Sequence, residues 1–274
     1  MTSTLSVNVF TAPEKAIIGE RPRPWGPPMA WDATTSTLIF GENDAVLVDT
    51  LTTADEAEAL ARWIELHHRN LSTIYVTHMH IDHYGGLSVL QRHFPDARAI
   101  ATPKSVELMP KTSEELAVYR KLLPGLPTEI TVPEPYDKDV FTVEGQEVHI
   151  IEQGTTDADA STSVYVPSID LVVGGDVLYN QCHMMVASST PESRANWIAD
   201  LDRLTALNPK MAVAGHKKVG LPDTPDAIEG TKRYLTDFGR LKESTSGDQE
   251  LYDAMTGLYP DWASNQTWLM FGLG

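Results

Sequence analysis

The sequence predicts an α/β protein with one large core, and three observations carry this prediction. Short runs rich in β-branched residues, such as 45–49 and 211–216, are bounded by Gly, Asn and Asp and indicate buried strands. Other segments, such as 57–68, place apolar residues at helical spacing. The chain has 274 residues, 42% of them hydrophobic, which suffices for one sizeable core with an added subdomain.

Strands and helices alternate through the first half of the chain. The expected strands are 6–10, 36–40, 45–49, 70–77 and 97–101, and residues 41–44 form a hairpin turn between the second and third. The expected helices are 53–68, 84–94 and 113–123, the last bounded by Pro124 and Gly125.

The second half begins with strands and ends with helices. Strands are expected at 140–144, 147–152, 162–166 and 170–175, and helices at 191–207, from Thr224 onward, and at 248–258. We therefore expect a core over 1–222 and a C-terminal helical extension over 223–274 that packs on it. The apolar end after Tyr259 needs covering, either by the core or by a second subunit, so a homodimer is a second expectation.

An irregular segment lies near the N-terminus. Residues 20–32 contain four prolines, which exclude a regular helix or a central strand, together with Trp25, Met29 and Trp31. Apolar side chains on such a loop predict a pocket wall, while simple core packing is the alternative.

The segment Thr-His-Met-His-Ile-Asp-His-Tyr-Gly-Gly (77–86) carries most of the functional information. It brings His78, His80, Asp82 and His83 within six positions, directly after a buried strand. Imidazole and carboxylate groups are the ligands that suit zinc and neighbouring divalent metals. The two-residue spacing fits an extended loop rather than one face of a helix, and could hold one metal or two close together.

Three further strands end in a residue of the same chemistry. Val-Val-Gly-Gly-Asp ends at Asp176, Met-Ala-Val-Ala-Gly-His at His216, and Ala-Val-Leu-Val-Asp at Asp49. Alone, each could be a capping residue or an ordinary loop residue. Because α/β sheets build their sites beyond the carboxyl ends of strands, their repetition indicates partners for the histidine cluster.

With these motifs the chain resembles the metallo-β-lactamase fold superfamily, whose signature is His-x-His-x-Asp-His followed by a Gly-His, a strand-end Asp and a late Gly-His. The resemblance runs from about Ser36 to Lys217. It implies a first metal held by His78, His80 and a third histidine, and a second held by Asp82, His83 and His216. It further implies that Asp176 bridges the two metals and that Asp49 supports the site from behind. We accordingly expect an α/β (α+β) fold that forms a four-layer αββα sandwich, with the metal site at one edge.

One position departs from the family pattern. Thr155 stands where the resemblance places the third histidine of the first metal, and a neutral hydroxyl is a poor replacement for imidazole. Three outcomes follow: an enzyme that uses mainly the second site, a first site repaired by Asp157, Asp159 or His183, or a chain without hydrolytic activity. Since every ligand of the second site is present, we favour the first two.

Two other polar residues near the expected site have open roles. His183 follows Asp176 by seven residues and is either a substrate contact or substitute ligand, or an ordinary loop histidine beside Met184 and Met185. Lys217 directly follows His216 and could hold a substrate carboxylate, although a solvated lysine is the more common case.

The charge balance limits the partners. With 38 acidic and 21 basic residues the net charge is −17, and no basic stripe occurs, which argues against nucleic-acid binding. The single cysteine, Cys182, excludes an intrachain disulfide framework. No signal-peptide pattern or membrane-spanning run is found, so we expect a cytoplasmic protein without membrane contact.

Metal-dependent hydrolysis of a small molecule is the expected activity. Zinc, as one or two ions, is the expected cofactor, with iron or manganese as alternatives; the metal lowers the pKa of water so that hydroxide can attack a polarised carbonyl. Asp82 is the expected catalytic residue, orienting the nucleophile or moving a proton. A lactone, ester, thioester or amide fits this acidic chain better than a polyanion, whereas β-lactam hydrolysis is not expected. An iron-dependent redox enzyme and a non-catalytic metal- or ligand-binding protein remain alternatives.

Overall fold

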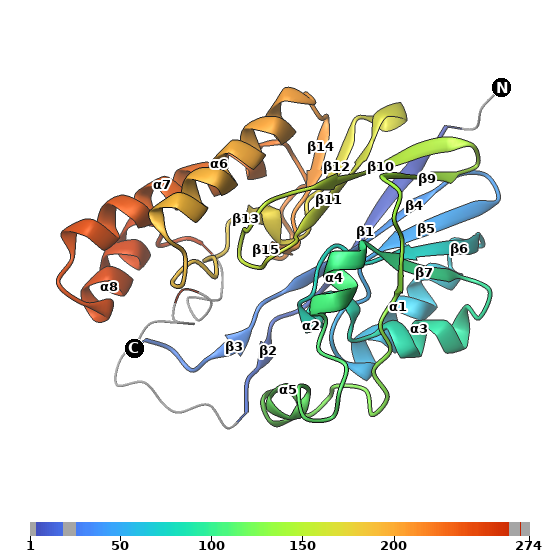
Figure 1. The fold of residues 1–274 in the computed structure, drawn as a ribbon, viewed down its shortest axis with the longest axis horizontal. Helices are drawn as coiled ribbons and strands as arrows, with labels where there is room; N and C mark the ends of the chain where they lie inside the picture. The colour runs from blue at the N-terminus through green and yellow to red at the C-terminus, as the bar shows by residue number, and fades with distance from the viewer. Residues whose placement is uncertain (1–3, 19–25, 263–268, 270–274) are drawn as a thin grey trace.

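Two β-sheets pack face to face, with helices on both outer sides (Figure 1). The computed structural model describes residues 4–18, 26–262 and 269. The predicted four-layer αββα sandwich is confirmed, and the two sheets are mixed, with both parallel and antiparallel pairs.

The first sheet has eight strands and carries the histidine segment. Its order is β13-β15-β4-β5-β6-β7-β8, and β1 pairs with β4. The strands are β1 (Ser6–Ala12), β4 (Thr34–Phe40), β5 (Asp44–Val48), β6 (Asn70–Tyr75), β7 (Arg98–Ala101), β8 (Glu134–Pro135), β13 (Tyr179–Asn180) and β15 (His216–Lys217). Because β5, β6 and β7 are parallel, the residues that follow them emerge at the same edge.

The second sheet has five strands in the order β14-β12-β11-β10-β9. They are β9 (Val140–Val143), β10 (Gln146–Glu152), β11 (Thr162–Val166), β12 (Leu171–Val173) and β14 (Met211–Val213). Strands β12 and β14 are parallel, so Asp176 and His216 leave this sheet at a common end. A separate two-stranded sheet pairs β2 (Lys15–Ala16) with β3 (Ala30–Trp31).

Alternation along β5 explains the layering. Val46 and Val48 belong to the hydrophobic cluster between the two sheets, while Ala45 and Leu47 belong to the cluster under the outer helices. Successive strand side chains point to opposite faces, so a strand that is apolar throughout must be covered on both sides.

Helices α1 (Ala54–Glu65) and α3 (Leu87–His93) cover the outer face of the first sheet (Figure 1). A capping box fixes the start of α1: Glu56 N–H donates to the Thr53 hydroxyl, and Thr53 N–H donates to the Glu56 carboxylate. The short elements on this side are α2 (Ile81–Tyr84), α4 (Pro103–Leu108) and α5 (Ala117–Leu122).

Helices α6 (Pro191–Ala206), α7 (Asp226–Ser244) and α8 (Asp248–Leu258) lie on the opposite side, over the second sheet and beyond it (Figure 1). One hydrophobic cluster joins them; it contains Trp197 and Leu201 of α6, Phe238 of α7 and Met255 of α8. The C-terminal helices therefore share a core with α6. Two 3-10 turns, Pro167–Ile169 and Gly175–Val177, complete the elements. No helix in the described part of the chain is long and apolar enough to cross a membrane.

The helix predicted over 84–94 is wrong in its bounds. It divides at Gly85 and Gly86 into α2 and α3, and a Cβ on Gly86 would overlap the Thr50 carbonyl. Gly86 N–H donates to the Leu51 carbonyl at 2.9 Å. The glycine backbone at this break therefore packs directly against the loop that follows β5, and this contact holds the histidine segment in place.

Candidate metal centre

Four strands deliver polar side chains to one edge of the sandwich. Asp49 follows β5, His78 and His80 follow β6, Asp176 follows β12, and His216 follows β14. The structure brings two sets of ligand atoms together, each within 4.8 Å, and we call them the first and second groups. The first group is His78, His80, Asp157 and Asp176, and the second group is Asp82, His83 and His216.

Asp176 joins the two groups. Its Oδ2 lies 3.1 Å from His216 Nε2 and 3.5 Å from His78 Nε2, and its Oδ1 lies 3.0 Å from His83 Nε2. His80 Nδ1 is 3.8 Å from the same Oδ2. One buried carboxylate therefore faces imidazoles of both groups.

Several atoms of the two groups lack hydrogen-bond partners although they are buried. Within the described part of the chain these are His78 Nε2, Asp82 Oδ1, His83 Nε2, Asp157 Oδ2 and Asp176 Oδ1. Buried polar atoms are normally paired, because an unpaired one costs about 1–3 kcal/mol. Nitrogen and oxygen atoms that converge without hydrogen-bond geometry fit a bound divalent cation.

Asp49 orients two of the imidazoles. Its Oδ2 accepts from His83 Nδ1 at 2.8 Å and from the Thr77 hydroxyl at 2.9 Å, and its Oδ1 accepts from Thr77 N–H at 2.8 Å. Since the Thr77 proton points to Asp49, the Thr77 oxygen must accept from His78 Nδ1, 3.0 Å away. In their neutral forms, both imidazoles would therefore carry the proton on Nδ1 and present an unprotonated Nε2 to the centre.

The backbone of Asp49 makes this arrangement possible. Its φ of 66° lies in the left-handed region, which Asp tolerates better than most residues because its short side chain bonds locally. The turn directs the carboxylate back beneath the histidine segment.

The peptide before β4 orients the second group. The Ala33 carbonyl accepts from His216 Nδ1 at 3.1 Å, so that His216 Nε2 faces the centre, 3.1 Å from Asp176 Oδ2, and the Thr34 hydroxyl donates to Asp82 Oδ2 at 3.4 Å. The ring of Tyr179 stacks on that of His216 with centroids 5.5 Å apart.

Comparison with known proteins agrees with this geometry. A family model described as the Metallo-beta-lactamase superfamily matches residues 29–216, more than half of the chain. The chain belongs to the metallo-beta-lactamase superfamily. The fold of a metallo-beta-lactamase from Pontibacter korlensis superposes with a TM-score of 0.61 at 17% identity, covering 86% of this chain and 97% of that one.

Two curated proteins are related in sequence. "Metallo-beta-lactamase type 2" of Bacteroides fragilis is 25% identical over 214 residues, 76% of each chain. An "(R)-specific secondary-alkylsulfatase" of a Pseudomonas species is 29% identical over 144 residues, 50% of this chain but only 20% of that protein. As members of the superfamily these relatives support a metal-dependent hydrolase at the level of the family.

The first group departs from the superfamily pattern in a way that the sequence left open. Thr155 is exposed and donates to Asp159 Oδ1 at 2.7 Å, and neither residue belongs to a ligand group. Asp157 instead lies at the centre, with Oδ2 3.1 Å from His80 Nδ1 and Oδ1 accepting from Thr156 at 2.9 Å. The first group thus contains Asp157 as a side chain besides His78, His80 and the shared Asp176, and Asp157 is one of the three residues that the sequence offered for this position.

The charges of the centre depend on one another. Burial would lower the pKa of the His80 imidazole, but the charge of Asp157 and the nearby carboxylate oxygens of Asp157 and Asp176 raise it to about 10. Burial would also lower the pKa of His83 and His216. The charge of Asp176 has the largest opposing effect, and the pKa of both imidazoles is raised well above the usual value. Burial would raise the pKa of the Asp176 carboxyl, but the imidazoles around it hold that pKa well below its usual range. The carboxylates therefore attract cations, whether protons or a metal.

Two glycines permit the close approach of the strand ends. A Cβ on Gly215 would overlap Asp176 Oδ1, and Gly175 has a φ of 52° with the Thr77 side chain against it. Both positions need a residue without a side chain.

Two of the proposed substitute residues lie away from the ligand groups. His183 is buried, and its Nδ1 lies 2.9 Å from the Tyr234 hydroxyl. Lys217 is buried in an ion pair with Asp223, at 2.7 Å, and is not available to a substrate carboxylate.

The predicted pocket wall is only partly described. Met29 packs in the cluster of α6, α7 and α8, and Trp31 packs near Tyr84, so both side chains are buried as the core-packing alternative expects. Trp25 lies outside the described residues.

The residues that hold the ligands in position from outside the two groups gave little signal in the sequence. These residues contact the ligands through a hydroxyl or a carbonyl group, and they are Thr77, Ala33 and Thr34. Only Thr77 could have been noticed in the sequence, because it directly precedes His78. Tyr179 could have been noticed three residues after Asp176, but its stacking on His216 depends on the parallel pairing of β13 and β15.

Proposed function

We propose that this chain is a metal-dependent hydrolase of a small acyl compound, namely a lactone, ester, thioester or amide. The observation that carries the proposal is the convergence of two ligand groups on Asp176, with five buried ligand atoms left without hydrogen bonds. Zinc is the proposed cofactor. Iron and manganese remain alternatives, because the first group combines two imidazoles with carboxylates.

His78, His80, Asp157 and Asp176 would hold one ion, and Asp82, His83 and His216, with Asp176 shared, would hold another. A divalent ion bound there lowers the pKa of water toward neutrality and polarises a carbonyl group.

Within the chain, Asp82 is the proposed proton carrier. It is buried, and only its Oδ2 is engaged, by Thr34 and by the His216 and His83 imidazoles, while Oδ1 has no hydrogen bond among the described residues. A carboxylate with one oxygen held and the other unpaired can orient a water molecule and pass its proton to the leaving group.

The charge of the chain favours a substrate with little negative charge of its own, and the acyl compounds meet this condition. The chain carries a net charge of −17, which disfavours polyanionic substrates by repulsion. The non-catalytic alternative rested on Thr155, and Thr155 lies outside both ligand groups. The alkylsulfatase relative supports a second candidate, hydrolysis of a sulfate ester, which carries a single negative charge.

The test combines metal content with a substrate panel. Protein purified without added metal is analysed for zinc, iron and manganese, and then assayed on a lactone, a carboxylic ester, a thioester, an amide, an alkyl sulfate and a β-lactam. We expect close to two metal equivalents per chain and turnover of one of the four acyl classes, which a chelator abolishes and added metal restores. Full metal occupancy with turnover of the alkyl sulfate alone would favour the second candidate, and occupancy with no turnover would overturn both.

An Asp82→Asn variant tests the proton carrier. It keeps the size of the side chain but not its basicity, so we expect a loss of about 10²-fold or more in kcat. Asp159→Asn, an exposed carboxylate outside both groups, is the matched control.

A further inference from the structure

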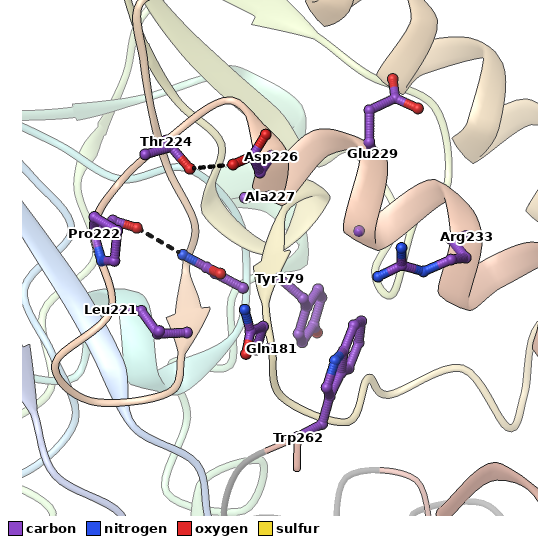
Figure 2. Close-up of a pocket in the computed structure, with 12 residues that line it drawn as sticks. Tyr179, Gln181, Leu221, Pro222, Thr224, Asp226, Ala227, Glu229, Arg233 and Trp262 are labelled. Atoms are coloured by element: carbon purple, nitrogen blue, oxygen red, sulfur yellow. Dashed lines mark hydrogen bonds between the residues drawn. The ribbon is translucent and has the colours of Figure 1, made fainter. Parts of the chain in front are cut away.

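A cavity beside α7 is lined by Tyr179, whose ring also stacks on that of His216 in the metal centre (Figure 2). It has a volume of about 450 Å³ and lies between β13, the loop around Pro222 and the start of α7. A neighbouring cavity of about 370 Å³ shares Gln181, Arg233 and Trp262 with it. The two form one groove large enough for a small molecule.

Among the residues that the structure describes, Arg233 is the only basic one that lines either cavity. Figure 2 shows it reaching from α7 toward Trp262 and Tyr179. Asp237, one turn further along α7, is already engaged, because its Oδ1 accepts from Arg240 and its Oδ2 from the Tyr259 hydroxyl, both at 2.7 Å.

The acidic residues at the start of α7 are engaged as well. Asp226 accepts from the Thr224 hydroxyl at 3.2 Å, and Glu229 pairs with Lys232 at 3.2 Å. Within the described residues, Arg233 has no carboxylate at ion-pair distance. Its guanidinium shares one hydrogen bond with the Tyr259 hydroxyl, and its charge acts on Asp237. A guanidinium has five N–H donors, so the remaining ones can still serve a ligand in the cavity.

Trp262 offers a fixed aromatic wall beside this guanidinium. Its ring stacks on Tyr234 with centroids 5.1 Å apart and an interplanar angle of 11°, and it contacts Tyr259 at 4.4 Å. A ring held by two others loses little freedom when a flat ligand packs against it.

Two backbone features keep the groove open. Gly230 lies in the second turn of α7, inside the helix, where a glycine lowers helix stability. A Cβ at this position would meet nothing within 4 Å, so the packing of the protein does not require a glycine there. Gln181 lines both cavities with a φ of 54°, a left-handed conformation that is unfavourable for this residue type. Bare helix backbone and local strain at the same cavity are typical of a ligand site.

We propose that this groove binds a small aromatic or apolar monocarboxylate, with its carboxylate on Arg233 and its flat part against Trp262. The planar guanidinium matches the two oxygens of a carboxylate. The side chains of Asp226, Glu229 and Asp237 around the groove repel a doubly charged phosphate more than a single carboxylate. This site is separate from the metal centre and does not depend on the proposed function.

The test uses benzoate as the probe, titrated into the metal-loaded full chain by calorimetry, with benzyl alcohol and phenyl phosphate as comparison ligands. Arg233→Gln removes the anion-binding group, and we expect binding about tenfold weaker or more, the loss of one charge-assisted interaction. Arg62→Gln, the same change at an exposed position on α1, should leave binding unchanged.

Gly230→Leu provides the second arm. A Cβ at Gly230 meets no protein atom within 4 Å, and Gly230 lines the cavity, so we expect a leucine side chain to occupy cavity space and abolish benzoate binding. The unfolding temperature should stay equal or rise, because leucine favours the helix. Gly257→Leu makes the same change in α8, at a position that also has open space but lines neither cavity, and should not affect binding.

Three results would overturn the proposal. The first is that benzoate does not bind to the unmodified chain. The second is that Arg233→Gln and Gly230→Leu bind benzoate as tightly as the unmodified chain does, which would place the benzoate at the metals or elsewhere. The third is that phenyl phosphate or benzyl alcohol binds as tightly as benzoate.

Discussion

His83 and His183 are equally buried but lie in opposite surroundings. His83 faces Asp49 and Asp176, whose charges raise its pKa well above the usual value against the effect of burial. His183 lies against the rings of Tyr234 and Trp262, and burial lowers its pKa to about 4. Burial alone therefore does not make a histidine a metal ligand; the carboxylates around it decide.

The largest expected effect is that of removing the carboxylate that both ligand groups share. Asp176→Ala leaves the imidazoles of the centre without their common partner, and we expect the loss of both metal equivalents and of about 3–5 kcal/mol of stability. Elemental analysis and urea unfolding measure the two effects. The control is Asp159→Ala, and two retained equivalents in Asp176→Ala would refute the comparison.

The next effect should be confined to the first group. In Asp157→Ala, His80 loses its nearest carboxylate, and we expect about one metal equivalent to be lost while the second group keeps its own. Asp157→His, which restores an imidazole, should retain both metals and bind zinc in preference to manganese. Equal metal content in all three chains would show that Asp157 is not a ligand.

A smaller effect is expected from the residue that orients the imidazoles. Asp49→Asn preserves shape and tolerates the left-handed backbone, but it replaces a charged acceptor that receives three hydrogen bonds. We expect metal affinity to fall by about 10–100-fold, with the metal stoichiometry unchanged at saturation. Competition with a chromophoric chelator measures the affinity, and unchanged affinity would separate Asp49 from the centre.

The smallest effect concerns His183. Its pKa is about 4 in the folded chain and about 6.5 when unfolded, so below pH 6.5 the unfolded chain takes up a proton that the folded chain does not. Stability contributed by neutral His183 is thus present above pH 6.5 and lost as the pH falls toward 4, by about 2 kcal/mol at pH 5. Unfolding of the unmodified chain and of His183→Asn at pH 7 and pH 5 isolates this contribution, and parallel losses would contradict it.

The sequence by itself determined the ligand strand and most of the ligands. Four of them lie within six positions after one buried strand, and local spacing is enough to place them together at the end of that strand. The structure puts His78 and His80 before α2 and Asp82 and His83 within it. The αββα layering was also predictable, because the motifs of the chain resemble those of a superfamily with that architecture, and apolar strands between amphipathic helices agree with it.

Only the tertiary structure decided what completes the first group. The sequence offered three substitute ligands for the position of Thr155 without distinguishing them, namely Asp157, Asp159 and His183. The position of a residue along the chain does not show in which direction its side chain points. The turn after β10 directs Asp157 inward and leaves Thr155 and Asp159 exposed, while the packing of α7 encloses His183 among aromatic rings. A ligand set is fixed by where side chains converge, and that depends on contacts between segments far apart in the sequence.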